Sequence, residues 1–155
     1  MKKLLYALFF LTCFLLDRIS KLCILKYITE PKLITDYFNL SIAWNKGVSW
    51  SLLSFDSMLG KSLLTAFILC VIVCFSIYTL IQLKNRHNIM FEVMVLAGAL
   101  SNVVDRFLYG AVLDFLEFHL QTWYWPTFNV ADIFVVVGVF GIILKNMYEI
   151  YVVKN

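Results

Sequence analysis

Residues 112–132 read VLDFLEFHLQTWYWPTFNVAD, and this stretch decides the fold. It places Asp114 and Asp132 on either side of a short aromatic loop, next to long apolar segments. A carboxylate at a membrane boundary is costly to desolvate, so it usually pairs, coordinates or reacts. Two carboxylates that can meet therefore predict acid–base chemistry on a substrate that arrives through lipid.

The composition of the whole chain indicates a membrane protein. Its 155 residues are 62% hydrophobic and 15% charged, with a mean hydropathy of +0.85. A soluble domain of this size carries more charge, so we expect one integral membrane domain over residues 1–155. The net charge is only +3 and the basic residues are scattered, so no nucleic-acid partner is expected.

Four apolar stretches are long enough to cross a hydrocarbon core about 30 Å thick. They are residues 4–26, 62–83, 89–109 and 130–152. The predicted fold class is therefore an all-α membrane protein with four transmembrane helices. Its outer loops are residues 27–61 and 110–129.

The first stretch imitates a signal peptide, with two lysines ahead of an apolar run. Leu16, Asp17 and Arg18 follow where a cleavage site would need small residues. We therefore expect an uncleaved first helix.

Basic residues in the short loops predict the orientation of the four helices. Most gather on one side: Lys2, Lys3, Lys84, Arg86, His87 and Lys154. That side, with both termini, is predicted to be cytoplasmic. Lys32, Lys46 and Lys61 lie in the first outer loop and depart from this pattern.

The first outer loop is rich in aromatic and β-branched residues. Its residues 37–53 read YFNLSIAWNKGVSWSLL, which predicts strands about a turn at Asn45-Lys46-Gly47. We expect a small β-cradle at the extracytoplasmic surface of the membrane. In the second outer loop, Trp123, Tyr124 and Trp125 are typical of anchors at headgroup level.

Polar groups from four parts of the chain reach one depth. At 1.5 Å per residue, Asp17 lies about 21 Å above Lys3, and Asp105 lies about 25 Å above the start of the third helix. Asp132 begins the fourth helix on the same side, and Asp114 follows the third. The sequence therefore predicts a polar site in the outer third of the membrane.

Two helices carry polar side chains at helical spacing. Asp17 and Lys21 are four residues apart with the acid first, which predicts an ion pair that is mainly structural or that orients a substrate or another helix. Gly98, Asn102 and Arg106 share one face of the third helix. Gly98 allows another backbone to approach closely, and Asn102 and Arg106 could bind a peptide or a lipid head group. The alternative for this face is contact between helices, with Asp105 structural and neutralising Arg106.

Residues 129–132, NVAD, open the fourth helix. Asn129 is a good N-cap and Asp132 completes a capping box, which alone would explain both residues. The pairing with Asp114 favours chemistry, because two carboxylates about 4 Å apart repel by roughly 4 kcal/mol, or about three pKa units. One acid then keeps a proton while the other activates water. Asp132, near a helix N-terminus, is the candidate for the more acidic member, although the two titrate as a unit.

Five blocks together resemble lipoprotein signal peptidase, also called signal peptidase II, over nearly the whole chain. They are DRISK at 17–21, NKGVSW at 45–50, GALSNVVDR at 98–106, VLDF at 112–115 and FNVAD at 128–132. The resemblance implies four membrane helices, an extracytoplasmic β-cradle and a catalytic pair, Asp114 and Asp132. The other positions that match the family around its active site are Asp17, Lys21, Asn45, Gly98, Asn102, Arg106 and Asn129. Ser101 departs from the glycine common in the family and adds a side chain at a tight helix contact.

The resemblance also implies an activity and a location. The expected enzyme is an aspartic endopeptidase of the bacterial cytoplasmic (inner) membrane, multi-pass, with its active site toward the extracytoplasmic face. Its substrates would be diacylglyceryl-modified prolipoproteins, cut just before the lipid-bearing cysteine. Membrane lipid and globomycin-type peptide inhibitors are further implied partners. Asn45 and Trp50 are candidates for substrate contact.

Three other classes of protein are less favoured. An ion-coupled transporter would place its carboxylates near the bilayer midplane. A disulfide-handling protein would need cysteines in the outer loops, and a purely structural subunit would not need matched aspartates. The cysteines lie in apolar runs without a CxxC or His-containing metal pattern, so neither a metal nor a cofactor is expected. They are Cys13, Cys23, Cys70 and Cys74.

Overall fold

The computed structural model describes residues 1–47 and 57–154. Within them the chain forms four long helices and four strands. The helices are α1 (Lys2–Tyr27), α2 (Met58–Lys84), α3 (Met90–Tyr109) and α4 (Val130–Lys154). The strands are β1 (Lys32–Thr35), β2 (Phe38–Asn45), β3 (Val112–Leu120) and β4 (Trp123–Tyr124).

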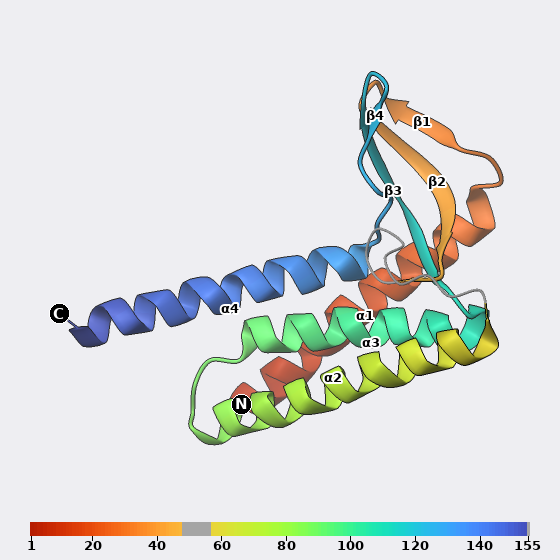
Figure 1. Cartoon of the computed structure of the whole chain (residues 1–155). Helices are drawn as coiled ribbons and strands as arrows, with labels where there is room; N and C mark the ends of the chain where they lie inside the picture. The colour runs from red at the N-terminus through yellow and green to blue at the C-terminus, as the bar shows by residue number, and fades with distance from the viewer. Residues whose placement is uncertain (48–56, 155) are drawn as a thin grey trace.

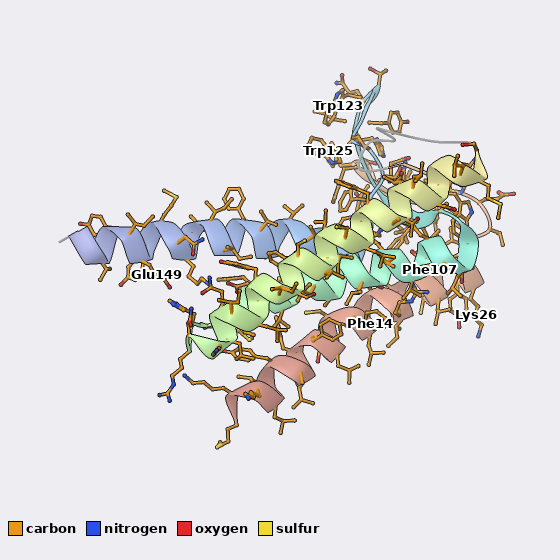
Figure 2. The ribbon with its side chains drawn as sticks, turned by 60° about the horizontal axis from the view of Figure 1, so that its bottom comes forward. Phe14, Lys26, Phe107, Trp123, Trp125 and Glu149 are labelled. Carbon is orange, nitrogen blue, oxygen red and sulfur yellow. The ribbon has the colours of Figure 1, made fainter. Side chains whose placement is uncertain are left out.

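The helices and the sheet occupy different ends of the molecule. The sheet stands where α1 ends and α4 begins, whereas both chain termini lie toward the opposite end (Figure 1). Each helix follows the apolar stretch predicted for it: α3 begins one residue later, and the other three are extended by at most four residues at either end. Trp123 and Trp125, the expected headgroup anchors, lie on the sheet beyond the helices and are 58% and 43% exposed (Figure 2).

Two of the described helices are long and apolar enough to cross a membrane by length and composition. These are Met58–Lys84 and Val130–Val152. The other two helices are less apolar because α1 contains Asp17, Arg18 and Lys21 and α3 contains Asp105 and Arg106. The four-span arrangement and the orientation of the termini stay predictions.

The small sheet expected beside the helices is present: four antiparallel strands in the order β1-β2-β3-β4. The hairpin turn between β1 and β2 lies at residues 36–37. At the turn predicted for Asn45-Lys46-Gly47, β2 ends at Asn45, and a strand after this turn would lie outside the described residues. The longest strand, β3, comes from the second outer loop and pairs with β2 from Phe38↔Phe118 to Asn45↔Val112. Trp50 lies outside the described residues.

Strand β3 is amphipathic in a way that positions Asp114. Leu113 and Phe115 are buried in a cluster with Ile24 and Ile28 at the end of α1. Side chains alternate between the two faces of a strand, so Asp114 points to the opposite face. Burial of its two apolar neighbours therefore fixes which way this carboxylate faces.

Helices α3 and α4 pack closely because glycines lie between them. A Cβ atom on Gly98 would stand 2.4 Å from the backbone oxygen of Ala131, and one on Gly138 would stand 2.8 Å from that of Phe91. Neither backbone oxygen can rotate away. The close approach that Gly98 was predicted to allow is thus confirmed, and it sets the position of the first turn of α4.

We expect Gly98→Ala to destabilise the protein, because its methyl group forces α3 and α4 apart. Overpacking of this kind costs typically about 1–3 kcal/mol. Thermal unfolding of purified protein in detergent measures the loss. Val139→Ala, at an exposed position of α4, is the control and should unfold close to wild type. Equal stability of Gly98→Ala and wild type would contradict this packing.

Candidate active site

The first turn of α4 contains the capping box that the sequence predicts. The backbone N–H of Asp132 donates to Asn129 Oδ1 at 2.9 Å, and the backbone N–H of Asn129 donates to Asp132 Oδ2 at 3.1 Å. These two bonds fix the orientation of the Asp132 carboxylate. Its second oxygen, Oδ1, accepts a hydrogen bond from Asn102 Nδ2 at 2.8 Å.

Asp114 reaches the same place from the sheet. Its Oδ1 accepts from the Asn129 side-chain amide at 2.6 Å, and its Oδ2 accepts from Asn45 Nδ2 at 3.0 Å. The residue is only 3% exposed. Asn129 therefore holds both acids, Asp114 through its side chain and Asp132 through its backbone. The two carboxylates that the sequence sets 18 positions apart are brought together around one asparagine.

The environment of Asp114 favours its protonated form. Burial, and next the negative charge of Asp132, raise the pKa of the Asp114 carboxyl to about 7. Hydrogen bonds from Asn45 and Asn129 and the charge of Lys21 act in the opposite direction. Asp114 therefore keeps a proton up to about neutral pH, as one member of an acid pair requires.

Asn102 connects the acids to a buried charge network. Its side-chain oxygen accepts from Lys21 Nζ at 2.8 Å and from Asn129 Nδ2 at 3.1 Å. Its amide nitrogen donates to Asp132. The side chain of Asn102 therefore has two donors at its oxygen and one acceptor at its nitrogen. Only this orientation of the amide satisfies all three partners.

Lys21 and its partners form the centre of that network. Lys21 Nζ lies 2.8 Å from Asp17 Oδ2 and 2.8 Å from Asp105 Oδ2, and all three residues are at most 1% exposed. The predicted ion pair of Asp17 with Lys21 is confirmed. Arg18 also pairs with Asp105. Buried charges are tolerated only when they are paired and hydrogen-bonded, and each charge in this network has such a partner.

The interpretation that Asp105 neutralises Arg106 is replaced by a different pairing. The Asp105 carboxylate pairs with Arg18 and Lys21, and its Oδ2 accepts the backbone N–H of Leu113 at 3.2 Å. Arg106 instead donates to the backbone oxygen of Gly47 at 2.5 Å. Asp105 therefore ties the end of α3 to the start of β3, which supports its expected structural role.

Asp17 also contacts another helix, α4, which is one of the roles predicted for its pair with Lys21. Its Oδ1 accepts the backbone N–H of Ala131 at 2.8 Å, at the positive end of the α4 dipole. Its Oδ2 accepts the hydroxyl of Ser101 at 2.6 Å. The side chain of Ser101, fully buried, thus fits this contact and adds a hydrogen bond to it.

Arg106 and Asn45 together hold the chain after β2. Asn45 Oδ1 accepts the backbone N–H of Gly47 at 3.0 Å, while Arg106 binds the Gly47 oxygen. The contact of Asn45 with Gly47 is local and fits the turn predicted at Asn45-Lys46-Gly47. The contact of Arg106 with Gly47 depends on the whole fold, and no local pattern in the sequence predicts it.

Metal ligation has no candidate in the parts of the chain that the structure describes. Residues 1–47 and 57–154 contain no group of three or more His, Cys, Asp or Glu side chains placed to hold an ion. The polar atoms of the site are instead carboxylates, amides and two paired cations.

The chain is similar to known proteins over most of its length. The family model described as signal peptidase (SPase) II matches residues 9–148. The lipoprotein signal peptidase of Pelagibacter ubique is 36% identical over 142 residues, covering 89% of this chain and 84% of that protein. That of Blochmanniella pennsylvanica is 36% identical over 131 residues, covering 83% and 78%.

Solved structures show the same fold. A bacterial membrane enzyme determined by the in meso method at 2.3 Å resolution superposes with a TM-score of 0.75 at 22% identity, covering 93% of this chain and 88% of that one. A second such enzyme, at 1.9 Å resolution, gives a TM-score of 0.66 at 28% identity, with 90% of each chain covered. The chain belongs to the signal peptidase II family, the lipoprotein signal peptidases.

Proposed function

We propose that this protein is a membrane aspartic endopeptidase that removes the signal peptide from diacylglyceryl-modified prolipoproteins, cutting just before the lipidated cysteine. The family membership supports a peptidase of prolipoprotein signal peptides. One observation carries the aspartic mechanism: Asn129 binds both Asp114 and Asp132 directly. Two carboxyl groups therefore meet at one buried point, and the environment of each is different.

In the proposed mechanism the two acids have opposite protonation states. Asp132, ionised, takes a proton from water as the water oxygen bonds to the scissile carbonyl carbon. Asp114, protonated, donates its proton to the carbonyl oxygen and stabilises the tetrahedral intermediate. When the intermediate collapses, the C–N bond breaks, the leaving nitrogen takes the proton from Asp132, and Asp114 recovers its own. No metal or covalent nucleophile takes part.

The polar residues around the acids have supporting roles in this proposal. Asn102 and Asn129 orient the carboxylates. Asn45 lowers the pKa of Asp114 through its hydrogen bond and contacts the substrate. Arg106, at the edge of the site, binds backbone oxygens of the precursor as it binds Gly47 here. Asp17 and Lys21 maintain the position of α4, and Gly98 allows its approach.

The proposal also includes a location. Residues 1–155 form one domain of four transmembrane helices in the bacterial inner membrane, with both termini cytoplasmic. The acids then lie in the outer leaflet, facing the extracytoplasmic side. The acyl chains of the precursor hold its cleavage site at that depth, and lipid surrounds the enzyme. Globomycin-type peptides are expected to compete with the precursor for this site.

Asp114→Asn and Asp132→Asn should each abolish cleavage of a lipidated precursor, because either change removes the acid or the base. A gel-shift assay with a synthetic acylated precursor in detergent measures this. Asp36→Asn, in the exposed turn between β1 and β2, is the matched control and should cleave at the wild-type rate.

The thermal unfolding of both variants should show that they remain folded. Wild-type turnover by either one would refute the pair. The same precursor without its diacylglyceryl group should be cut poorly, and equal cleavage of both precursors would contradict the proposed substrate class but leave the acid pair untouched.

Activity should fall as the pH rises through about 7, because Asp114 then loses the proton that it donates. Asn45→Ala removes a hydrogen bond that favours the ionised form of Asp114, so its pKa should rise by about one unit. The alkaline limb of the kcat/KM profile, which reports the free enzyme, should move to higher pH by the same amount.

Asn39→Ala is the matched control for this pH profile. Asn39 lies on the same strand, but its amide donates to Glu117 at 3.0 Å and not to the acid pair. The control should keep the wild-type profile. If Asn45→Ala leaves the alkaline limb at its wild-type pH, or moves it to lower pH, Asp114 is not the proton donor.

A further inference from the structure

The hydroxyl group of Ser101 bonds to another helix and not within its own. In a helix interior, serine and threonine hydroxyls often donate to the backbone oxygen four residues earlier. Several hydroxyls of this protein do so, those of Thr12, Thr65, Ser76 and Thr79. Ser101 of α3 instead donates to Asp17 Oδ2 of α1 at 2.6 Å, and both residues are fully buried. The hydroxyl of Ser101 therefore serves a contact between helices.

Asp17 carries this contact on to the first turn of α4. Its other oxygen, Oδ1, accepts the backbone N–H of Ala131 at 2.8 Å, one of the N–H groups that a helix leaves unpaired at its start. Ala131 directly precedes Asp132, whose own N–H is capped by Asn129. Asp17 and Asn129 together therefore fix the first turn of α4, and with it the position of Asp132.

Ser101 determines the direction of the Asp17 carboxylate, because the other partner of Oδ2 is shared. That partner is Lys21, whose Nζ lies 2.8 Å from Asp17 Oδ2 and equally 2.8 Å from Asp105 Oδ2 and from Asn102 Oδ1. An ammonium group has three donors, so these contacts use all of them. Without the Ser101 hydroxyl, Oδ2 would keep only this shared partner, and the carboxylate would be free to turn away from the backbone of α4.

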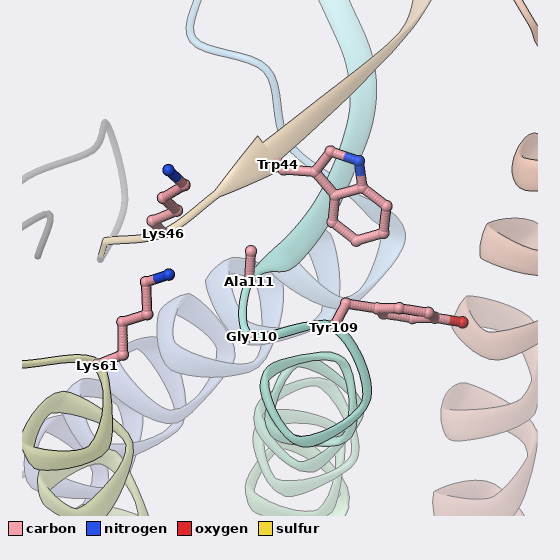
Figure 3. Close-up of a pocket in the computed structure, with 6 residues that line it drawn as sticks. All are labelled: Trp44, Lys46, Lys61, Tyr109, Gly110 and Ala111. Carbon is pink, nitrogen blue, oxygen red and sulfur yellow. The ribbon is translucent and has the colours of Figure 1, made fainter. Parts of the chain in front are cut away.

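Helix α3 supports both acids, so the fit of α4 against α3 sets the distance between them. The end of α3 continues through residues 109–111 into β3, the strand that contains Asp114 (Figure 3). The turn of α3 that contains Ser101 meets the first turn of α4, where Asn102 donates to Asp132 at 2.8 Å. A contact that holds α4 at this turn therefore also holds Asp132 in place relative to Asp114.

We propose that Ser101 is a positioning residue of the acid pair. Its hydroxyl orients the Asp17 carboxylate toward the first turn of α4, and this contact keeps Asp132 at its distance from Asp114. The inference rests on the proposed function, since it assigns Ser101 an effect on catalysis. Ser101 is fully buried, so it acts through Asp17 and not on the substrate. Glycine, common at this position in the family, has no hydroxyl, so the contact is not a property of the whole family.

Ser101→Ala tests this role, because it removes the hydroxyl, keeps the Cβ atom and favours the helix. We expect kcat for a lipidated precursor to fall about tenfold, since a displacement of about 1 Å in an active site costs about a hundredfold and this one is smaller. KM should stay within about twofold of wild type, because only the orientation of the acids changes. Ser76→Ala removes a hydroxyl that bonds within α2; it is the matched control and should keep the wild-type kcat.

Hydrogen–deuterium exchange, followed by mass spectrometry, is a second readout that needs no substrate. In Ser101→Ala the fragment that contains Ala131 should exchange about tenfold faster than in wild type, because its N–H no longer has a firmly oriented acceptor. In Ser76→Ala this fragment should exchange as it does in wild type.

A wild-type kcat in Ser101→Ala would overturn the inference. So would a lower kcat without faster exchange at Ala131, or a change confined to KM, because Ser101 would then not act through the start of α4. If Asp114→Asn and Asp132→Asn are inactive while Ser101→Ala cleaves at the wild-type rate, this inference alone fails and the proposed function stands.

Discussion

The site depends on Asn129, a single buried residue that belongs to a helix cap and to the acid pair at once. Its side-chain oxygen caps α4, its backbone N–H orients Asp132, and its side-chain amide binds Asp114. The helix cap is therefore present, and the proposed reactive role of Asp132 uses the same hydrogen bonds. The cap gives the carboxylate of Asp132 a fixed direction, which general-base chemistry on a bound water requires.

Buried charges around this asparagine hold four elements in register. Asp17 of α1 binds the first turn of α4, Lys21 of α1 binds Asn102 of α3, and Asp105 of α3 binds the first residues of β3. Removal of one partner from such a network costs about 3–5 kcal/mol, because a charge is left unpaired in the interior. The network thus tolerates little displacement of α4 against α1. The separation of Asp114 from Asp132 is held by contacts outside the pair itself.

Local patterns predicted the parts of this structure that depend on local chemistry. The length of the apolar runs predicted the helices, and the NVAD sequence predicted the cap. The spacing of Asp17 and Lys21 predicted their ion pair. Counting residues along each helix also predicted that the polar groups come to one level of the helices, and their contacts confirm that they meet. Strand β3 was missed because its pairing partner, β2, lies about 70 residues earlier in the chain. The contacts of Arg106 with Gly47 and of Asp17 with Ala131 were missed for the same reason, since each joins segments that only the complete fold brings together.

Infrared difference spectroscopy tests the central claim, a proton held by Asp114 near neutral pH, most directly. Spectra of the purified protein are recorded from about pH 4 to about pH 9, across the ordinary and the raised pKa of an aspartate, and the spectra of Asp114→Asn are subtracted. We predict a protonated-carboxyl C=O band that belongs to Asp114 and disappears with a midpoint near its pKa of about 7. A band lost near pH 4, the ordinary range of an aspartate, would show that burial and Asp132 do not hold the proton, and would contradict the acid pair.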